Sequence, residues 1–300
     1  GISKLKKGEK KMFTLSTDTD TDITPEIAKK YGYKLISMPY SIGENMVFPY
    51  EDFKEFKSHE YYDLLRTGVI PTTSAVSTER YKKYFEPELK KGNDILYVHF
   101  SRIMSGTFNG LNLVINELKE KYPDRNIYLL DTKAITVGAY VICSEIGELV
   151  LKGASIEEIF KWAETEVDHF ATYFFADDLQ FFKRSGRVSG LAAFFGGLIG
   201  IKPIITINQE GKMVSIAKAK GRKTAVERLV SYVEELGDDI KNHKFAIAHT
   251  DAPELVELLV NMLKEKFGDD LNIDIFPANP TAGAHCGPNA VGLSFHAIHR

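Results

Sequence analysis

The chain has few cysteines, little excess charge and no long hydrophobic run. Only two cysteines occur in 300 residues, Cys143 and Cys286. They are too few for a disulfide framework or a structural zinc site, and this favours a reducing cytoplasm. The formal net charge is −3, with 38 Lys and Arg against 41 Asp and Glu. This balance offers no basic field for nucleic acid or for an anionic membrane surface.

The longest apolar stretch of low charge covers residues 188–201 and ends before Lys202. It has 14 residues, four of them glycine, and is too short to span a bilayer, although a transient membrane contact stays open. Residues 1–11, GISKLKKGEKK, carry positive charge with no apolar segment behind them. We interpret them as a vector-derived remnant or a flexible arm, and not as a secretory signal.

Short apolar runs alternate with segments of helical periodicity, a pattern typical of α/β architecture. In the first half, strands are expected at 12–16, 95–100 and 126–131, and helices at 108–118, 135–151 and 156–167. In the second half, strands are expected at 172–175, 244–249, 272–276 and 291–296, a hairpin at 203–219, and helices at 178–183, 224–236 and 255–267. We therefore predict two α/β domains with parallel or mixed sheets, at residues 12–168 and 169–300.

Several motifs of cofactor chemistry are missing from the sequence. It has no dinucleotide-binding GxGxxG, no Walker A loop, no GxSxG elbow and no HExxH, so we predict neither a cofactor nor a metal. The segment TDTDTDIT at 17–24 resembles a calcium loop, but Ile23 and Lys29 stand where an EF-hand needs Gly and Glu. We interpret it as a loop whose Asp and Thr side chains bind backbone amides and cap a helix at Pro25.

Two hydroxyl-rich segments lie at strand–helix junctions: TTSAVS at 72–77 and SRIMSGT at 101–107. Ser105 and Thr107 precede a helix whose first amides are free, and Gly106 lets a ligand approach the backbone, which favours an anion site. Ligands of open parallel sheets bind at the carboxyl ends of the strands, where the second segment must lie. The alternative is that these residues are ordinary helix caps.

Two later segments combine glycine with charged or titratable side chains. LQFFKRSGRVS at 179–189 carries basic residues that either bind an anion or form a solvated turn. The glycine-rich apolar residues behind it either pack in the core or leave an opening for a long apolar ligand. TAGAHCGPN at 281–289 is expected to be a loop that presents His285, as a functional residue or as a structural hydrogen-bonding one.

Taken together and in this order, these segments resemble the DegV family, which includes the FakB fatty-acid-binding subunits of bacterial fatty acid kinase. Four motifs of the family are matched in the first part of the chain and its middle: a D-S-type turn at 17–23, a T-S-x-x-S loop at 73–77, an S-S-x-x-S-G-T loop at 101–107 and a K-R-G-G-R-I-S segment at 183–189. Four more follow: a K-P-I strand at 202–204, a hairpin glycine at Gly211, an R-G-R-K turn at 220–223 and a G-x-H-x-G-P-G-A tail at 283–290. Arg102, Ser185 and Asn289 depart from the family's pattern, at places that bear on selectivity or partner contact.

The resemblance implies a buried tunnel between two α/β domains that holds a single long-chain fatty acid. It assigns the carboxylate to Thr73 and Ser105, with Ser74, Gly106 and His285 completing the hydrogen-bond network. Our candidates for the wall along the acyl chain are Ala192, Phe194, Phe195, Leu198 and Ile201, and those for a partner-docking face are Lys183, Arg184, Arg187, Arg222 and Lys223. It further implies a cytoplasmic carrier, monomeric by default, that presents its ligand to a separate ATP-binding kinase subunit for acyl-phosphate formation.

Two other functions stay open. One is an acyl hydrolase or transferase with Ser105 as nucleophile and His285 as base, against which stands the lack of an elbow motif and of an orienting acid. The other is a sensor of a small anion or peptide, with the same fold and a closed tunnel.

Overall fold

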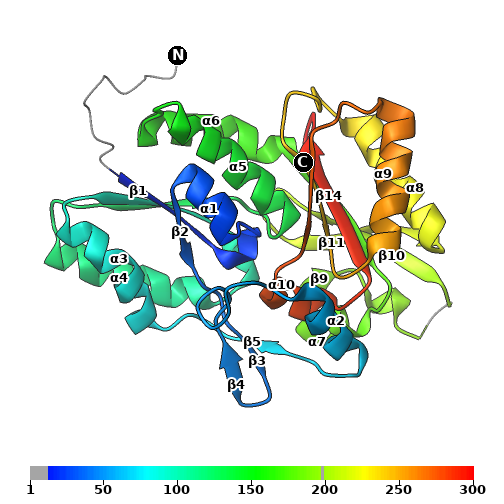
Figure 1. The fold of residues 1–300 in the computed structure, drawn as a ribbon, viewed down its shortest axis with the longest axis horizontal. Coiled ribbons are helices and arrows are strands. Elements are labelled where there is room, and N and C mark those ends of the chain that lie inside the picture. Colours follow the sequence, from blue (N-terminus) through cyan, green and yellow to red (C-terminus); the bar gives the residue numbers. More distant parts are fainter. Residues whose placement is uncertain (1–12, 197–198) are drawn as a thin grey trace.

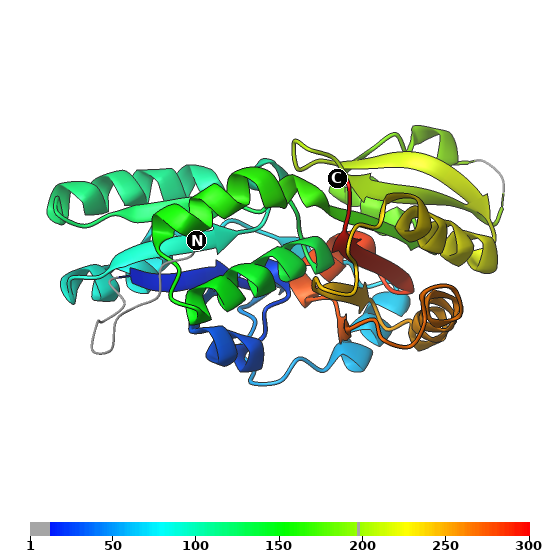
Figure 2. The ribbon, with the colours of Figure 1, turned by 90° about the horizontal axis from the view of Figure 1, so that it is seen from above.

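The computed structural model describes residues 13–196 and 199–300. The predicted arm at 1–11 and the predicted wall residue Leu198 lie outside these described residues. Figure 1 shows two α/β halves, and Figure 2 shows their sheets toward opposite ends of the long axis. Within the described ranges, no helix combines the length and the apolar character that a membrane crossing requires.

The first half is built on a parallel sheet in the order β2-β1-β6-β7. Its central strand β6 (Asp94–His99) is buried on both faces because its side chains alternate. Ile95 and Tyr97 point into the core under α3 and α4, whereas Leu96 and Val98 point into the core under α1 and α5. The bounds of these elements are β1 Phe13–Asp18, β2 Tyr33–Ile36, β7 Ile127–Asp131, α1 Pro25–Tyr31, α3 Thr78–Lys90, α4 Thr107–Lys121, α5 Val137–Leu151 and α6 Ile156–Glu166.

The second half is built on a mixed sheet in the order β13-β12-β14-β8-β10-β11-β9. Helices α8 (Arg222–Leu236) and α9 (Pro253–Phe267) share a core with its central strands. The short helices α7 (Gln180–Ser185) and α10 (Pro280–Cys286) pack against each other. The strands are β8 Phe170–Ala176, β9 Val188–Ser189, β10 Ile201–Ile207, β11 Met213–Lys220, β12 Phe245–His249, β13 Ile273–Pro277 and β14 Ala290–His296.

Two helices of the first half also contact the second. Helix α5 is apolar on nearly all sides and shares one core with Val98 of the first sheet and Ala246 of the second. Helix α2 (Ser58–Arg66) lies in the chain between β4 and β5 of a small sheet of order β4-β3-β5, whose strands are Asn45–Val47, Tyr40–Ile42 and Thr72–Thr73. From α2, Tyr61 and Tyr62 donate hydrogen bonds to the carbonyl oxygens of Pro280 and Ala278, at 2.7 and 2.6 Å. The chain therefore enters the second sheet near the predicted boundary at 168, but the two halves share packing on both sides of it.

The predicted strands and long helices are confirmed to within a few residues. The predicted cap is also confirmed, since Thr24 accepts from the Ile27 amide at the start of α1. The expected loop at 281–289 is wrong for most of its length, because residues 280–286 form α10. Asn279 caps this helix, Pro280 occupies its first turn, and a Cβ at Gly283 would lie 2.2 Å from the Tyr62 hydroxyl oxygen. The glycine permits close packing of α10 on α2.

We expect Tyr62→Phe to lower the free energy of unfolding by about 1–3 kcal/mol, because the change leaves the buried Ala278 carbonyl oxygen without its donor. The measurement is urea denaturation followed by circular dichroism. The same change at the partly exposed Tyr128 serves as the control and should cost under about 0.5 kcal/mol. Equal losses at both positions would contradict the assigned role of the α2–α10 contact.

Candidate functional site

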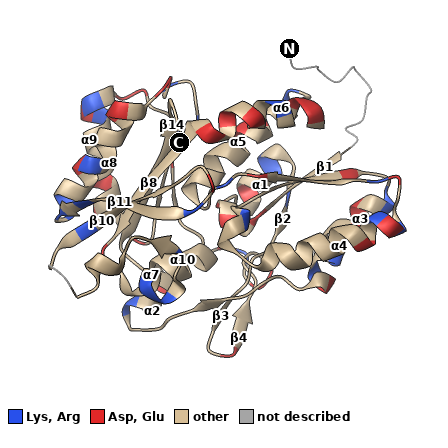
Figure 3. Cartoon of the chain, turned by 180° about the vertical axis from the view of Figure 1, so that it is seen from behind, with Lys and Arg blue, Asp and Glu red and all other residues tan. Residues whose placement is uncertain are grey.

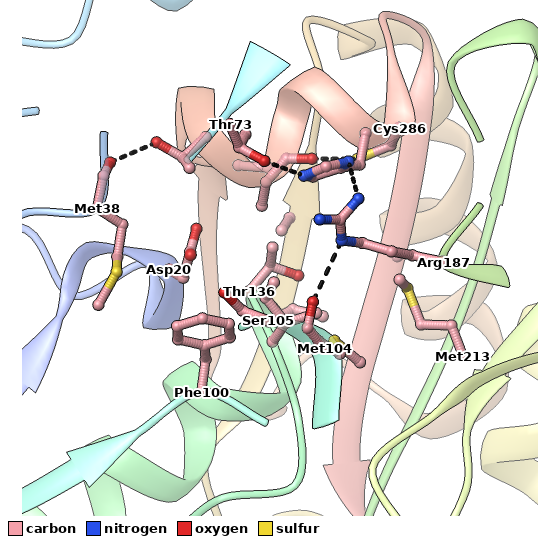
Figure 4. Close-up of a pocket in the computed structure, with 18 of the residues that line it drawn as sticks. Asp20, Met38, Thr73, Phe100, Met104, Ser105, Thr136, Arg187, Met213 and Cys286 are labelled. Atoms are coloured by element: carbon pink, nitrogen blue, oxygen red, sulfur yellow. Dashed lines mark hydrogen bonds between the residues drawn. The ribbon is translucent and has the colours of Figure 1, made fainter. Parts of the chain in front are cut away.

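A cavity lies between the two halves and holds about 1200 Å³ of space free of protein atoms, its mouth included. Both halves contribute to its lining: Thr73 and Ser105 come from the first, and Arg187 and His285 from the second. Figure 4 shows these side chains, with hydroxyl groups, an imidazole and a guanidinium gathered at one region of the wall.

A chain of hydrogen bonds connects Arg187, His285 and Thr73. Nη1 of Arg187 lies 3.3 Å from Nδ1 of His285, and Nε2 of His285 lies 3.0 Å from Oγ1 of Thr73. Burial, reinforced by the nearby Arg187 charge, lowers the pKa of His285 to about 3. The imidazole is therefore neutral at pH 7 and carries a single ring proton.

The chemistry of the partners decides which ring nitrogen of His285 holds that proton. A guanidinium only donates hydrogen bonds, so Nδ1 of His285 must accept from Arg187. Nε2 then holds the proton and donates it to Oγ1 of Thr73. Because that oxygen accepts from His285, the Thr73 hydroxyl hydrogen is left to donate to a group in the cavity.

The two hydroxyl-rich segments are joined at Thr107. Its Oγ1 accepts from the Val76 amide at 3.0 Å and lies 2.6 Å from the Tyr81 hydroxyl. Ser105 Oγ accepts from the Thr107 amide at 3.1 Å, which leaves the Ser105 hydroxyl hydrogen free to donate, whereas the N-cap position of α4 is occupied by Gly106. Ser74 and Gly106 also line the cavity. The structure thus brings all five predicted head-group residues to one cavity.

The apolar wall of the cavity differs from the predicted one. Ala192, Phe194, Phe195 and Ile201 are absent from the lining. Ala192–Phe194 forms a short turn. Phe194 and Phe195 are partly buried and pack against the core that contains Phe182. Ile201 begins β10. The apolar lining comes instead from both sheets and the segments that follow their strands: Phe100, Met104, Ile135, Val137, Phe174, Phe182, Ile207, Met213, Ala248 and Val291.

The basic residues predicted for docking do not share one setting. Arg187 is a cavity residue, with Nε donating to the Met104 carbonyl oxygen at 3.2 Å, as the anion-binding alternative for this segment expects, and its part in a docking face stays a prediction. Arg222 forms an ion pair with Asp177. Arg184 and Lys223 are exposed, and Lys183 lies over the Phe195 ring. Figure 3 shows acidic and basic residues mixed over the outer helices of both halves.

Three buried carboxyl groups at the end of β1 were interpreted from sequence as backbone-binding caps alone. Asp18 accepts from the Phe100 amide and the Tyr97 hydroxyl, and Asp22 accepts from the backbone and side chain of Asn279. Burial, only partly offset by these hydrogen bonds, raises the pKa of Asp18 and of Asp22 to about 7. Asp20 lines the cavity. The alternating TDTDTD pattern was the only signal of this cluster.

Comparisons with known proteins identify the family and the fold of this chain. The model of the DegV family matches residues 12–297. The chain belongs to the DegV family. It is 33% identical over 286 residues to a DegV domain-containing protein of Clostridium perfringens, which covers 95% of this chain and 97% of that protein. It is 27% identical to one from Caldanaerobacter subterraneus subsp. tengcongensis, with coverage of 93% and 96%.

Solved DegV structures share the fold over nearly the whole chain. A fatty-acid-binding DegV protein from Thermus thermophilus superimposes with a TM-score of 0.84 at 23% identity, covering 96% of this chain and all of that one. A stearic-acid-binding protein from Eubacterium ventriosum also gives 0.84, at 20% identity, covering 95% and 98%. The predicted fold class, a DegV-like mixed α/β architecture, is confirmed.

We expect the His285 ring to stay neutral from pH 8 down to about pH 4.5, with its proton on Nε2, because burial and Arg187 both oppose a positive charge there. The native state then binds no second proton at this ring between pH 6.5 and about 3, whereas the unfolded chain does. His285 therefore makes stability fall as the pH decreases through that window. The measurement is ¹⁵N NMR of the histidine rings, with His285→Gln to assign the signal. A titration midpoint near 6.5, or a proton on Nδ1, would contradict the proposed hydrogen-bond chain.

Proposed function

We propose that this protein binds a single long-chain fatty acid in the cavity, with the carboxylate at Thr73 and Ser105. The observation that carries the proposal is the joining of two free hydroxyl donors to a large apolar cavity. The fatty acids bound by DegV proteins of the same fold support it. Such an amphipathic cavity matches a ligand with one anionic end and a long hydrocarbon tail.

The tail supplies most of the binding free energy in this proposal. Transfer of about 14 methylenes from water to the apolar wall contributes on the order of 11 kcal/mol, at about 0.8 kcal/mol each. Loss of ligand freedom opposes this by roughly 4 kcal/mol or more. The hydroxyl donors fix the orientation of the carboxylate, and they do so without the desolvation cost of a buried ion pair.

The hydrogen-bond chain gives His285 and Arg187 distinct roles at the head group. His285 holds the Thr73 oxygen as an acceptor, so the threonine hydrogen is directed away from the ring. Arg187 fixes the imidazole tautomer through Nδ1 and also places a positive charge beside the site. Ser74 and Gly106 leave room for the carboxylate next to the first turn of α4.

We expect Thr73→Val and Ser105→Ala each to weaken palmitate binding about 10- to 100-fold. Each change removes one hydroxyl–carboxylate hydrogen bond, worth roughly 1.5–3 kcal/mol, and leaves the apolar wall intact. The measurement is equilibrium binding to delipidated protein. Mass spectrometry of the lipid extracted from freshly purified protein gives the native acyl chain length.

Ser231→Ala is the matched control, because Ser231 is partly exposed on α8 and its hydroxyl donates to the Arg228 carbonyl oxygen. It should bind palmitate as the unaltered protein does. Unchanged binding in a Thr73→Val, Ser105→Ala double variant would contradict the placement of the head group. An extract without fatty acid, together with no thermal shift on adding palmitate or oleate, would contradict the proposed function.

The proposed role includes presentation of the bound carboxylate to an ATP-dependent kinase partner. In that reaction a carboxylate oxygen attacks the γ-phosphorus of ATP, the bond to the β–γ bridging oxygen breaks, and ADP leaves as acyl phosphate forms. The neutral donors Thr73 and Ser105 leave the carboxylate negative and therefore nucleophilic. Arg184, Arg222 and Lys223 remain the candidates for the docking face, on grounds of exposure and charge.

Charge reversal at the docking candidates should separate presentation from binding. We expect Arg184→Glu with Lys223→Glu to reduce acyl-phosphate formation at least tenfold with a fatty acid kinase catalytic subunit and ATP, and to leave the fatty acid content unchanged. The product is trapped with hydroxylamine and quantified as the hydroxamate. Lys152→Glu, an exposed change at the end of α5, is the control. Full activity of the double variant would contradict this docking face.

The geometry disfavours the two alternative functions. As a serine hydrolase the site would need His285 bonded to Ser105 and oriented by an acid, whereas His285 contacts Thr73 and Arg187. A pKa of about 3 also makes His285 a poor base. As a sensor with a closed tunnel the protein would fill the space between its halves, whereas Phe100, Phe174 and Phe182 line an open cavity.

A further inference from the structure

Asp20 is a carboxyl group inside the cavity that the proposed head-group site does not use. It lies in the single turn Thr19–Thr21, which follows β1, and it is 5% exposed. Figure 4 shows Asp20 and Thr136 bordering the same cavity as Ser105 and Arg187. Its own backbone is held in place, since the Asp20 amide donates to Asp18 and its carbonyl oxygen accepts from the Thr136 amide.

The carboxyl group of Asp20 has no hydrogen-bond partner that accounts for its burial. Oδ1 is enclosed and unpartnered among the described residues. Asp18 and Asp22 differ in that each accepts a side-chain hydrogen bond, from Tyr97 and Asn279, although Oδ2 of Asp22 is likewise enclosed and unpartnered among the described residues. A carboxylate buried in this way pays a large desolvation cost, whereas a neutral carboxylic acid does not and gains a donor.

Among the described residues that line the cavity, Arg187 is the only Lys or Arg, and it does not neutralise Asp20 by direct contact. The guanidinium of Arg187 makes its hydrogen bonds to Met104, Ser185 and His285 and reaches Asp20 through space alone. The pKa of Asp20 is raised well above its ordinary value, mainly by burial and then by the charges of Asp18 and Asp22. The charge of Arg187 acts in the opposite direction and lowers this pKa. The other titratable groups around this cavity are the phenols of Tyr81 and Tyr97 and the neutral rings of His249 and His285, with the Cys286 thiol.

If a ligand carboxylate enters the same cavity, the charge state of Asp20 decides whether that carboxylate binds. Two carboxylates in one poorly solvated site repel strongly, and such pairs exist with one shared proton. We propose that Asp20 is the proton-holding partner of the ligand carboxylate: the cavity admits the anionic head group only while Asp20 is a neutral acid, and deprotonation of Asp20 expels the ligand. This inference rests on the proposed fatty-acid function and adds a proton-linked selectivity to that site.

The backbone of Thr136 is strained and is hydrogen-bonded to the turn that carries Asp20. Thr136 is β-branched yet has φ of +48°, a conformation that costs on the order of 1–3 kcal/mol. Its amide donates to the Asp20 carbonyl oxygen at 2.8 Å, so the strain is tied to the position of the Asp20 turn. Residue 136 itself lines the cavity, which places its side chain beside the acid.

The test is palmitate binding to delipidated protein between pH 6 and pH 9.5, for the unaltered chain and for Asp20→Asn. The amide of the variant is a neutral donor at every pH. Titration and aggregation of palmitate itself affect both proteins equally, so they cancel in the ratio of the two dissociation constants. We expect this ratio to be constant at low pH and to rise as Asp20 ionises, approaching tenfold per pH unit, as the unaltered protein loses affinity and the variant does not.

Asp22→Asn is the matched control, because Asp22 is equally buried two residues away and does not line the cavity. It should keep the alkaline loss of affinity, with that loss moved toward lower pH, because the charge of Asp22 helps to raise the pKa of Asp20. Asp20→Thr, another neutral replacement, repeats the test if the asparagine variant does not fold, and it should also lack the alkaline loss of affinity.

Parallel pH profiles of the unaltered and Asp20 variant proteins would overturn the inference and leave the fatty-acid function standing. A folded Asp20→Asn protein that binds no palmitate at any pH, while the unaltered protein does, would also overturn it, because the carboxylate would then be required. Absence of palmitate binding in every protein at every pH would overturn the fatty-acid function, and this inference with it.

Discussion

The hydrogen-bond chain from Arg187 through His285 to Thr73 is the interaction on which the site depends. It sets the direction of every proton at the head-group end, because a guanidinium cannot accept and a neutral imidazole holds a single ring proton. Arg187 places a positive charge near the site, and His285 donates a hydrogen bond to Thr73. In the proposed complex, the group that faces the ligand is the hydroxyl of Thr73. An anion can thus be bound in a low-dielectric cavity by neutral donors, with the cation held one residue away.

This chain exists only while the two halves of the molecule are held together. Thr73 belongs to the small sheet of the first half, whereas His285 lies on α10 of the second. Their contact is fixed by α2, whose Tyr61 and Tyr62 hydroxyls bond to the backbone at the start of α10. On the other side, α5 packs on both sheets. The cavity is therefore part of a shared core, and changes at the α2–α10 contact are expected to reach the head-group site.

At the carboxyl ends of the strands of the first sheet, buried acids with different roles lie close together. Asp18 and Asp22 accept amide, hydroxyl and carboxamide hydrogen bonds that fix the backbone around the cavity. Asp20, between them, faces the space where an anionic ligand is proposed to bind. The same short TDTDTD sequence thus supplies two structural acids and one acid in the cavity. The difference arises from the single turn at Thr19–Thr21, which directs successive side chains to different surroundings.

The sequence by itself determined the alternation of strands and helices, the family, and the identity of the polar residues at the head-group end. Those features are local: apolar periodicity sets each element, and hydroxyl and glycine residues follow the strands at fixed offsets. It did not determine the apolar wall, because the Gly-rich segment from Gly190 to Ile201 is equally compatible with lining a cavity and with packing outside it. Only the tertiary structure decided that α10 is a helix packed on Tyr62, that Arg187 faces His285 and not solvent alone, and that Asp20 is buried without a partner. These outcomes depend on which distant residues meet across two sheets, and such long-range contacts leave no periodic signature in the chain.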